Sequence, residues 1–154
     1  MNYIITSPLY YVNDKPHLGS TYTTIACDAI ARFRRLEGFE VVFLTGVDEH
    51  GLKIQRTSQS NKLSPQQHCD IISNSYIDLW DKYSITHDRF IRTTDSNHAE
   101  LVKLFFERVE SNGDIKLGRQ KGWYCVGCEE FKETQKEDDH SVCPIHLKPL
   151  EWRD

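Results

Sequence analysis

The feature that most constrains the fold is a strand-like run, a helical repeat and a second strand-like run near the start of the sequence. Residues 2–6 form a short apolar run that predicts a buried strand. From Pro16 or His17 to about Leu36, apolar residues recur at helical spacing, and they are Tyr22, Ile25, Ala26, Ala29, Ile30 and Phe33. Residues 40–45 are continuously apolar, as in a strand covered on both faces. Because a strand–helix–strand unit with short connections has a right-handed crossover, we predict an α/β fold with a parallel sheet.

The rest of the sequence extends this alternation and then changes character. It predicts helices at 52–61, 64–83 and 96–111, and a third strand at 89–91. From Ile115 onward, glycines, cysteines and short strand-like pieces replace the long periodic segments. We therefore predict one α/β domain over residues 1–114 and a small inserted module over residues 115–154.

The junction between the first strand and the first helix, residues 6–20, predicts an anion site. It places backbone N–H groups, the imidazole of His17 and the small residue Gly19 at the start of a helix. Helix N-termini attract anions through unpaired N–H donors and the helix dipole. The glycine lets a ligand approach the backbone closely. A nucleotide phosphate is the ligand that fits this junction.

Composition narrows the classes of protein that fit. The 154 residues suit one ordinary domain with its own core, and 38% hydrophobic with 27% charged residues describe a globular protein. A net charge of −4 gives no general case for nucleic-acid binding. No run approaches the ~18 apolar residues of a membrane span, and no signal-peptide pattern begins the sequence. A cytoplasmic location is expected, where the five cysteines would stay reduced and available for metal binding.

Two ligand couples predict a zinc site in the module. Cys125 and Cys128 are two residues apart, and fourteen residues later Cys143 and His146 repeat that spacing. Three thiolates and one imidazole suit Zn²⁺, and a closed set of four ligands is typical of a structural site. His140 is an alternative fourth ligand, although it lies outside the second couple. The two remaining cysteines, Cys27 and Cys69, lie on helical apolar faces and are expected to pack in the core.

The order of several motifs points to one family. The sequence contains Tyr-Val-Asn-x-x-Pro-His-Leu-Gly, then Thr-Gly-Val-Asp-Glu-His-Gly, then Cys-x-x-Cys, and it closes on Cys-Pro-Ile-His-x-Lys-Pro-Leu-Glu-Trp-Arg. In this order the motifs resemble the N-terminal part of the methionyl-tRNA synthetases, which are class I aminoacyl-tRNA synthetases. The resemblance covers essentially all 154 residues. It implies the first half of a Rossmann-like (HUP-type) parallel-sheet catalytic domain at 1–114 and an incomplete zinc-bearing connective insertion at 115–154.

The resemblance also implies roles for individual residues. The family signature His-Ile-Gly-His, which binds ATP, corresponds to His17, Leu18, Gly19 and Ser20. Within it His17 would contact the phosphates, Gly19 would leave room for adenine, and His17 and Ser20 would be the catalytic positions. Asp48 would receive the α-ammonium group of methionine and Tyr11 would close over its side chain. The remaining methionine-site residues implied are Pro8, Leu9 and His50.

The implied chemistry needs no protein nucleophile. The methionine carboxylate attacks the α-phosphorus of ATP, which is bound with Mg²⁺, and pyrophosphate leaves. Methionine is then transferred from methionyl-adenylate to tRNA(Met). The protein positions the substrates and neutralises charge on the phosphate oxygens.

The sequence departs from the family pattern in two respects. Ser20 replaces the second signature histidine, and a hydroxyl donates a hydrogen bond but carries no positive charge. Loss of such a donor commonly costs ~10²–10³ in rate. The sequence also lacks the Lys-Met-Ser-Lys-Ser loop and the helical anticodon-binding domain. We therefore expect part of a longer enzyme that is inactive when isolated.

Three alternatives remain open on the sequence alone. The first is a non-catalytic remnant that binds zinc and nucleotide. The second is a class I synthetase for leucine, isoleucine, valine or cysteine, against which stand Tyr11 and residues 48–51. The third is a zinc-finger nucleic-acid binder, which is disfavoured because basic side chains in the module are balanced by acidic ones. Those side chains are Arg119, Lys121 and Lys132 against Glu129, Glu130 and Glu133.

Overall fold

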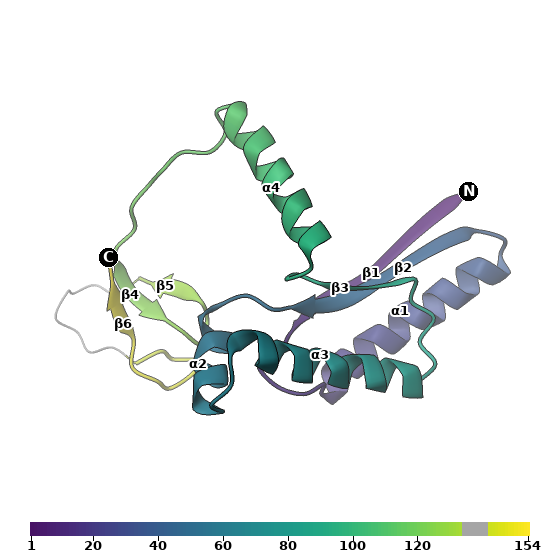
Figure 1. The fold of residues 1–154 in the computed structure, drawn as a ribbon, viewed down its shortest axis with the longest axis horizontal. Coiled ribbons are helices and arrows are strands. Elements are labelled where there is room, and N and C mark those ends of the chain that lie inside the picture. The colour runs from purple at the N-terminus through teal and green to yellow at the C-terminus, as the bar shows by residue number, and fades with distance from the viewer. Residues whose placement is uncertain (134–141) are drawn as a thin grey trace. The chain divides into compact units, whose positions relative to one another are not determined.

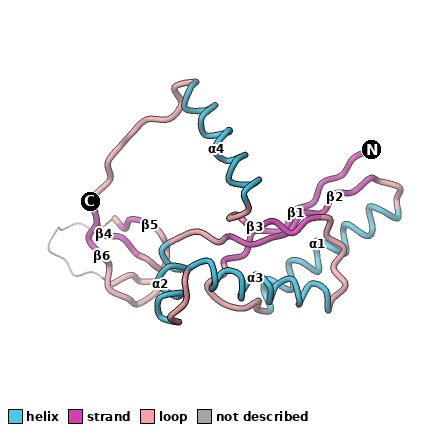
Figure 2. Tube along the Cα trace, in the orientation of Figure 1, coloured by secondary structure: helices cyan, strands magenta, loops and turns pink. Residues whose placement is uncertain are grey.

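The computed structural model describes residues 1–133 and 142–154, and Figures 1 and 2 show its strands and helices. The chain divides into two compact units, Met1–Leu104 and Phe105–Asp154. The division expected after residue 114 stays a prediction, because helix α4 (Ser96–Ser111) begins in the first unit and ends in the second. No helix among the described residues is long and apolar enough to cross a membrane.

The first unit is built on a parallel sheet with the strand order β1-β2-β3. The strands are β1 (Asn2–Tyr11), β2 (Glu40–Asp48) and β3 (Arg89–Arg92). Helix α1 (Leu18–Leu36) connects the first two strands. Helices α2 (Leu52–Ser60) and α3 (Pro65–Lys82) connect the second and third. The predicted α/β fold with a parallel sheet is confirmed.

Two strands run further than their apolar runs predicted. Strand β1 continues through residues 7–11, and β2 continues through residues 46–48. Those extensions pair with each other, up to Tyr11 opposite Asp48. Backbone pairing across the sheet thus extends both strands into sequence that carries proline, glycine and polar side chains. Residues 7–11 and 46–48 are therefore the last residues of these strands, whereas the sequence predicted that they would follow the strands.

The core of this unit covers one face of the sheet. Val41 and Phe43 pack against Ala31 of α1. A second cluster joins the ends of β1 and β2 to α2 and α3, and consists of Val12, Val47, Ile54, Cys69, Ile72, Tyr76 and Trp80. On the opposite face Ile4 is 69% exposed and Val42 is 41% exposed. The expectation that residues 40–45 are covered on both faces is therefore not met among the described residues.

Helix α1 turns a largely polar face toward the sheet. Its predicted apolar positions are exposed, with Tyr22 at 74% and Phe33 at 56%. The buried positions are Ser20, Thr21, Thr24, Asp28 and Ala31. Asp28 can be buried because it accepts hydrogen bonds from Thr86 and Arg32. Such hydrogen-bond partners offset the cost of burying polar groups. Helical periodicity in the sequence does not reveal them, so the buried face of this helix was predicted wrongly.

The second unit contains an antiparallel sheet with the order β5-β4-β6. Its strands are β4 (Gly122–Cys125), β5 (Glu130–Lys132) and β6 (Glu151–Arg153). Cys125, Cys143 and Leu150 form its small core. Because so few apolar side chains are buried, hydrophobic packing alone is too small to stabilise this unit, and a further source of stability such as a bound metal is expected.

Candidate functional site: the ends of strands β1 and β2

An irregularity in β1 decides which side chains reach the candidate site. Thr6 pairs with Leu44 and Leu9 pairs with Gly46, so Ser7 and Pro8 together lie opposite Thr45. The extra residue is a β-bulge, where a proline without an N–H donor is tolerated. Since side chains alternate along a strand, the extra residue moves Leu9 to the face opposite the core.

Three predicted methionine-site residues consequently share one face of the sheet. Tyr11 lies two residues after Leu9, and Tyr11 is the register partner of Asp48 on the neighbouring strand. Register partners on adjacent strands point to the same face. Leu9 and Tyr11 are each 42% exposed. The fold therefore brings Leu9, Tyr11 and Asp48 together at the carboxyl ends of two parallel strands, where ligands bind in open α/β sheets.

His17 is the N-cap residue of α1. Its Nδ1 atom accepts hydrogen bonds from the backbone N–H groups of Gly19 (3.0 Å) and Ser20 (3.4 Å). Because Nδ1 acts as an acceptor, the proton of the neutral ring belongs on Nε2. Nε2 is thereby a donor at a helix N-terminus, which is a favourable position for an anion.

Gly19 allows this arrangement. A Cβ atom at position 19 would lie 2.9 Å from Cε1 and 3.0 Å from Nδ1 of His17. Any larger residue would push the imidazole away from the backbone that it caps. The structure therefore gives Gly19 a second reason to be glycine, beside the room for adenine that the family resemblance implies.

Ser20 completes the cap from the other side. Its Oγ atom accepts a hydrogen bond from the His17 backbone N–H (3.1 Å) and donates one to the His17 carbonyl (2.8 Å). The residue is 2% exposed. The hydroxyl thus has two partners inside the capping box, and its expected phosphate contact stays a prediction. Its neighbour Leu18 is 85% exposed.

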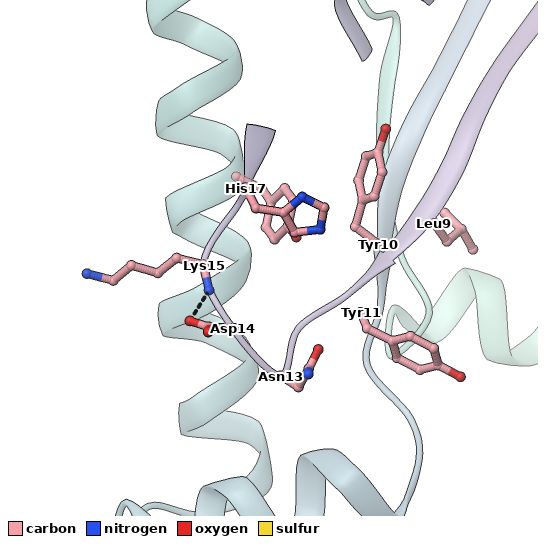
Figure 3. A pocket seen from close by; sticks show the side chains of 8 residues that line it. Leu9, Tyr10, Tyr11, Asn13, Asp14, Lys15 and His17 are labelled. Carbon is pink, nitrogen blue, oxygen red and sulfur yellow. Dashed lines mark hydrogen bonds between the residues drawn. The ribbon is translucent and has the colours of Figure 1, made fainter. Parts of the chain in front are cut away.

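A hollow of ≈ 520 Å³ lies beside this cap (Figure 3). Of the predicted site residues it is lined by Leu9, Tyr11 and His17. Figure 3 shows the His17 ring and the Tyr10 ring flanking the same space, whereas the Lys15 side chain extends away from it. Tyr10, Asn13, Asp14, Lys15 and Tyr76 also line the hollow. Sequence reasoning did not single these residues out as ligands, although the first four lie within the signature segment.

Tyr10 and Tyr76 form one wall of this hollow. Their rings are stacked, with centroids 5.6 Å apart and an interplanar angle of 6°. The Tyr10 hydroxyl donates to the Ser20 carbonyl (3.1 Å) and shares a hydrogen bond with Thr24 Oγ1 (2.8 Å). Burial raises the pKa of Tyr10, so its hydroxyl stays protonated and tied to α1. The tyrosine pair joins β1, α1 and α3 around the hollow.

Asp48 and His50 are held by the residue that follows β3. Asp48 Oδ1 accepts hydrogen bonds from the His50 backbone N–H (3.3 Å) and from Thr93 Oγ1 (3.4 Å). His50 Nε2 lies 3.3 Å from the Thr93 carbonyl oxygen. Thr93 was not predicted as a site residue, because only the sheet register brings it beside Asp48. Neither Asp48 nor His50 lines the hollow beside His17.

Cys125, Cys128, Cys143 and His146 form a cluster in the second unit. One ligand atom from each lies within 4.8 Å of the others. The Cys128 and Cys143 sulfurs are 3.6 Å apart, and His146 Nδ1 lies 3.3–3.8 Å from the three sulfurs. A tetrahedral ion with Zn–S ≈ 2.3 Å and Zn–N ≈ 2.0–2.1 Å needs separations of about 3.5–3.8 Å. The predicted donor set therefore fits a structural zinc ion, while the alternative ligand His140 lies outside the described residues.

Local chemistry favours metal binding at this cluster. Backbone hydrogen bonding from His146 is the main influence that lowers the pKa of the Cys143 thiol, to about 6. Thiolates are the form that binds zinc. Gly127 permits the His146 ring to approach, because a Cβ atom there would lie 2.5–2.7 Å from three ring atoms.

Comparison with known proteins identifies the family. A sequence profile described as tRNA synthetases class I (M) matches residues 3–148. The chain therefore belongs to the class I tRNA synthetases of this type. A methionine–tRNA ligase from Thermosynechococcus vestitus is 55% identical over 99% of this chain, and the chloroplastic/mitochondrial methionine–tRNA ligase of Arabidopsis thaliana is 51% identical over 96%.

A solved structure gives the same assignment of the fold. Mycobacterium tuberculosis methionyl-tRNA synthetase in complex with methionyl-adenylate is 38% identical and superposes over 99% of this chain with a TM-score of 0.89. The chain spans 30% of that protein, 29% of the Thermosynechococcus ligase and 24% of the Arabidopsis ligase. The Rossmann-like assignment is thus confirmed for the part of the family fold that this chain covers.

Proposed function

We propose that the chain supplies the ATP signature and the methionine ammonium site of a methionine–tRNA ligase. The observation that carries this proposal is the joint placement of His17 at a helix N-terminus and Asp48 at the end of the neighbouring strand. The matched relatives are methionine–tRNA ligases, and the superposed structure contains methionyl-adenylate. The proposed substrates are ATP with Mg²⁺, methionine and tRNA(Met).

The proposed reaction begins with methionine activation. The methionine carboxylate oxygen attacks the α-phosphorus of ATP, a P–O bond forms, and the bond to the leaving pyrophosphate breaks. Nε2–H of His17 and the N-terminal end of α1 donate toward the phosphate oxygens, whose negative charge they stabilise. Asp48 receives the α-ammonium group, which orients the carboxylate for attack. Pro8, Leu9, Tyr11 and His50 complete the proposed methionine site.

The rest of the signature segment also has proposed roles, at Leu18, Gly19 and Ser20. Gly19 keeps the backbone close to the nucleotide, and the exposed Leu18 side chain leaves the helix terminus accessible. Ser20 replaces a charged donor by a hydroxyl that already serves the cap. We therefore expect slower activation than in family members with histidine at this position.

Zinc has a structural part in this proposal. Cys125, Cys128, Cys143 and His146 would hold the ion, and four protein ligands would leave it no open position for chemistry. When bound, zinc would cross-link the Cys125–Cys128 segment to the Cys143–His146 segment in a unit with a small apolar core. Reduced thiols suit a reducing compartment, and we propose a cytoplasmic location.

Methionine-dependent exchange between pyrophosphate and ATP tests the proposal. The 154-residue chain would replace the aligned segment of the Thermosynechococcus ligase, to which it is 55% identical. We expect exchange that needs methionine and is lost in His17→Ala and Asp48→Ala variants. Exchange with leucine, isoleucine or valine, or none with any amino acid in a folded graft, would contradict it. A folded graft that binds ATP without exchange would support the alternative of a non-catalytic nucleotide-binding remnant.

A further inference from the structure

Next to the proposed ammonium site lies a buried carboxylate that the proposed reaction does not use. Glu49 follows Asp48 directly, and its side chain is 0% exposed. Successive residues of an extended segment point to opposite sides, so Glu49 faces inward where Asp48 faces outward. A buried carboxylate is costly unless it is fully hydrogen-bonded, so its partners indicate what it does.

Three donors, from β3, from α3 and from the turn after β3, hold the Glu49 carboxylate. Arg92 Nε donates to Oε1 at 2.8 Å, and Ser73 Oγ of α3 donates to the same atom at 2.5 Å. Thr94 Oγ1 donates to Oε2. The Arg92 guanidinium also reaches Asp70 of α3, with Nη2 to Oδ1 at 2.6 Å. Glu49 thus binds the turn after β2 to the end of β3 and to α3.

Thr93 connects this buried cluster to Asp48. Its Oγ1 atom accepts a hydrogen bond from the Glu49 backbone N–H at 2.9 Å. The hydroxyl proton is therefore free to point at Asp48 Oδ1, which lies 3.4 Å away. Thr93 is 9% exposed, so water competes little for that proton. One hydroxyl fixes the turn and orients the carboxylate at the same time.

We propose that Glu49 and Thr93 are positioning residues that fix the Asp48 carboxylate for the amino group of the amino-acid substrate. This inference rests on the proposed function. Neither residue touches substrate in this account, and each acts through the turn formed by residues 48–50. Loss of either side chain should therefore raise KM for methionine and leave KM for ATP unchanged.

Two substitutions at Thr93 test the positioning role of its hydroxyl with little change in side-chain volume. In the graft described above, Thr93→Val removes the hydroxyl, whereas Thr93→Ser retains it. We expect Thr93→Val to raise KM for methionine in the exchange reaction about tenfold, with KM for ATP within twofold of the parent, in keeping with the loss of one hydrogen bond to the charged Asp48 carboxylate. Thr93→Ser should have a KM for methionine within about twofold of that of the parent graft.

Substitution of Glu49 needs a control for stability. Glu49→Gln keeps the shape of the side chain but leaves Arg92 with one carboxylate. Asp28→Asn is the matched control, because Asp28 is also a buried carboxylate held by a threonine and an arginine, and it lies away from the turn after β2. We expect both variants to lower the melting temperature, and only Glu49→Gln to raise KM for methionine.

The possible outcomes separate this inference from the proposed function. If the parent graft shows methionine-dependent exchange and Thr93→Val has an unchanged KM for methionine, the positioning role is wrong and the proposed function stands. If Thr93→Val raises the KM values for methionine and ATP equally, the cluster is merely structural and the inference is overturned. A parent graft that is folded but inactive contradicts the proposed function itself.

Discussion

The zinc cluster offers the sharpest test by substitution, at Gly127. The Cβ atom of alanine at this position would lie 2.5 Å from the nearest atom of the His146 ring, whereas ordinary contacts begin at 3.4 Å. The ring would therefore have to retreat by about 0.9 Å, which exceeds the roughly 0.2 Å tolerance of a metal–ligand distance. We expect Gly127→Ala to lose the imidazole ligand.

The expected loss of affinity is large enough to measure directly. Disturbing the support of a single ligand costs 10–100-fold in metal affinity, and we expect about 10²-fold here, which is ~2.7 kcal/mol. Competition against a zinc chelator measures this change. Binding of Co²⁺ provides a second readout, because its visible absorption reports the number of thiolate and imidazole ligands.

Gly118→Ala is the matched control, since it lies in the same unit and a Cβ atom there meets nothing within 4 Å. It should bind zinc as the parent does. If Gly127→Ala also retains the parent affinity and the parent Co²⁺ spectrum, His146 is not the fourth ligand. The assignment of the metal site would then be wrong.

Three further predictions follow from the same structure. Removing zinc with a chelator should abolish the near-ultraviolet circular dichroism of the Trp123–Trp152 pair, whose ring centroids are 5.4 Å apart, while the β1–β3 sheet stays folded; a pair signal that survives chelation would contradict a structural role for the metal. Gly19→Ala should displace the His17 ring, lower the unfolding free energy by about 1 kcal/mol and weaken ATP binding, as measured by thermal unfolding and ATP titration; unchanged values would show that the cap does not need glycine. Although burial by itself raises the pKa of Asp28, hydrogen bonds from Thr86 and Arg32 outweigh burial and hold that pKa below its usual value. The stability that Asp28 supplies is therefore present above about pH 4 and lost as the pH falls through its lowered pKa, so Asp28→Asn should flatten the acid limb of the unfolding free energy in denaturant titrations.

The course of the chain was predictable because it rests on local signals. Ser64 and Pro65 mark the start of α3, and the structure begins that helix at Pro65 with Ser64 as its cap. The spacing of Cys125, Cys128, Cys143 and His146 likewise predicted a cluster that the structure brings together. Signals of this kind lie within a few residues of one another, so they survive without knowledge of the tertiary fold.

The details of the site depend on contacts between distant segments. The local sequence does not predict that Ser7 and Pro8 form a bulge. That bulge nevertheless places Leu9 and Tyr11 on the same face of the sheet as Asp48. Thr93 is similarly distant in sequence and becomes a partner of Asp48 only through the pairing of β2 with β3. Tertiary hydrogen bonds also reversed the expected burial of α1, where Tyr22 is exposed.

The most direct measurement of the central claim is a ligand titration followed by NMR at His17 and Asp48. The graft would carry isotope labels that report the imidazole nitrogens and the side-chain carboxylates. ATP with Mg²⁺ should shift the Nε2 resonance of His17, methionine should shift the carboxylate resonance of Asp48, and neither ligand alone should produce the shift of the other. If both resonances stay in place at saturating ligand, or if they respond to the opposite ligands, the proposed site is wrong.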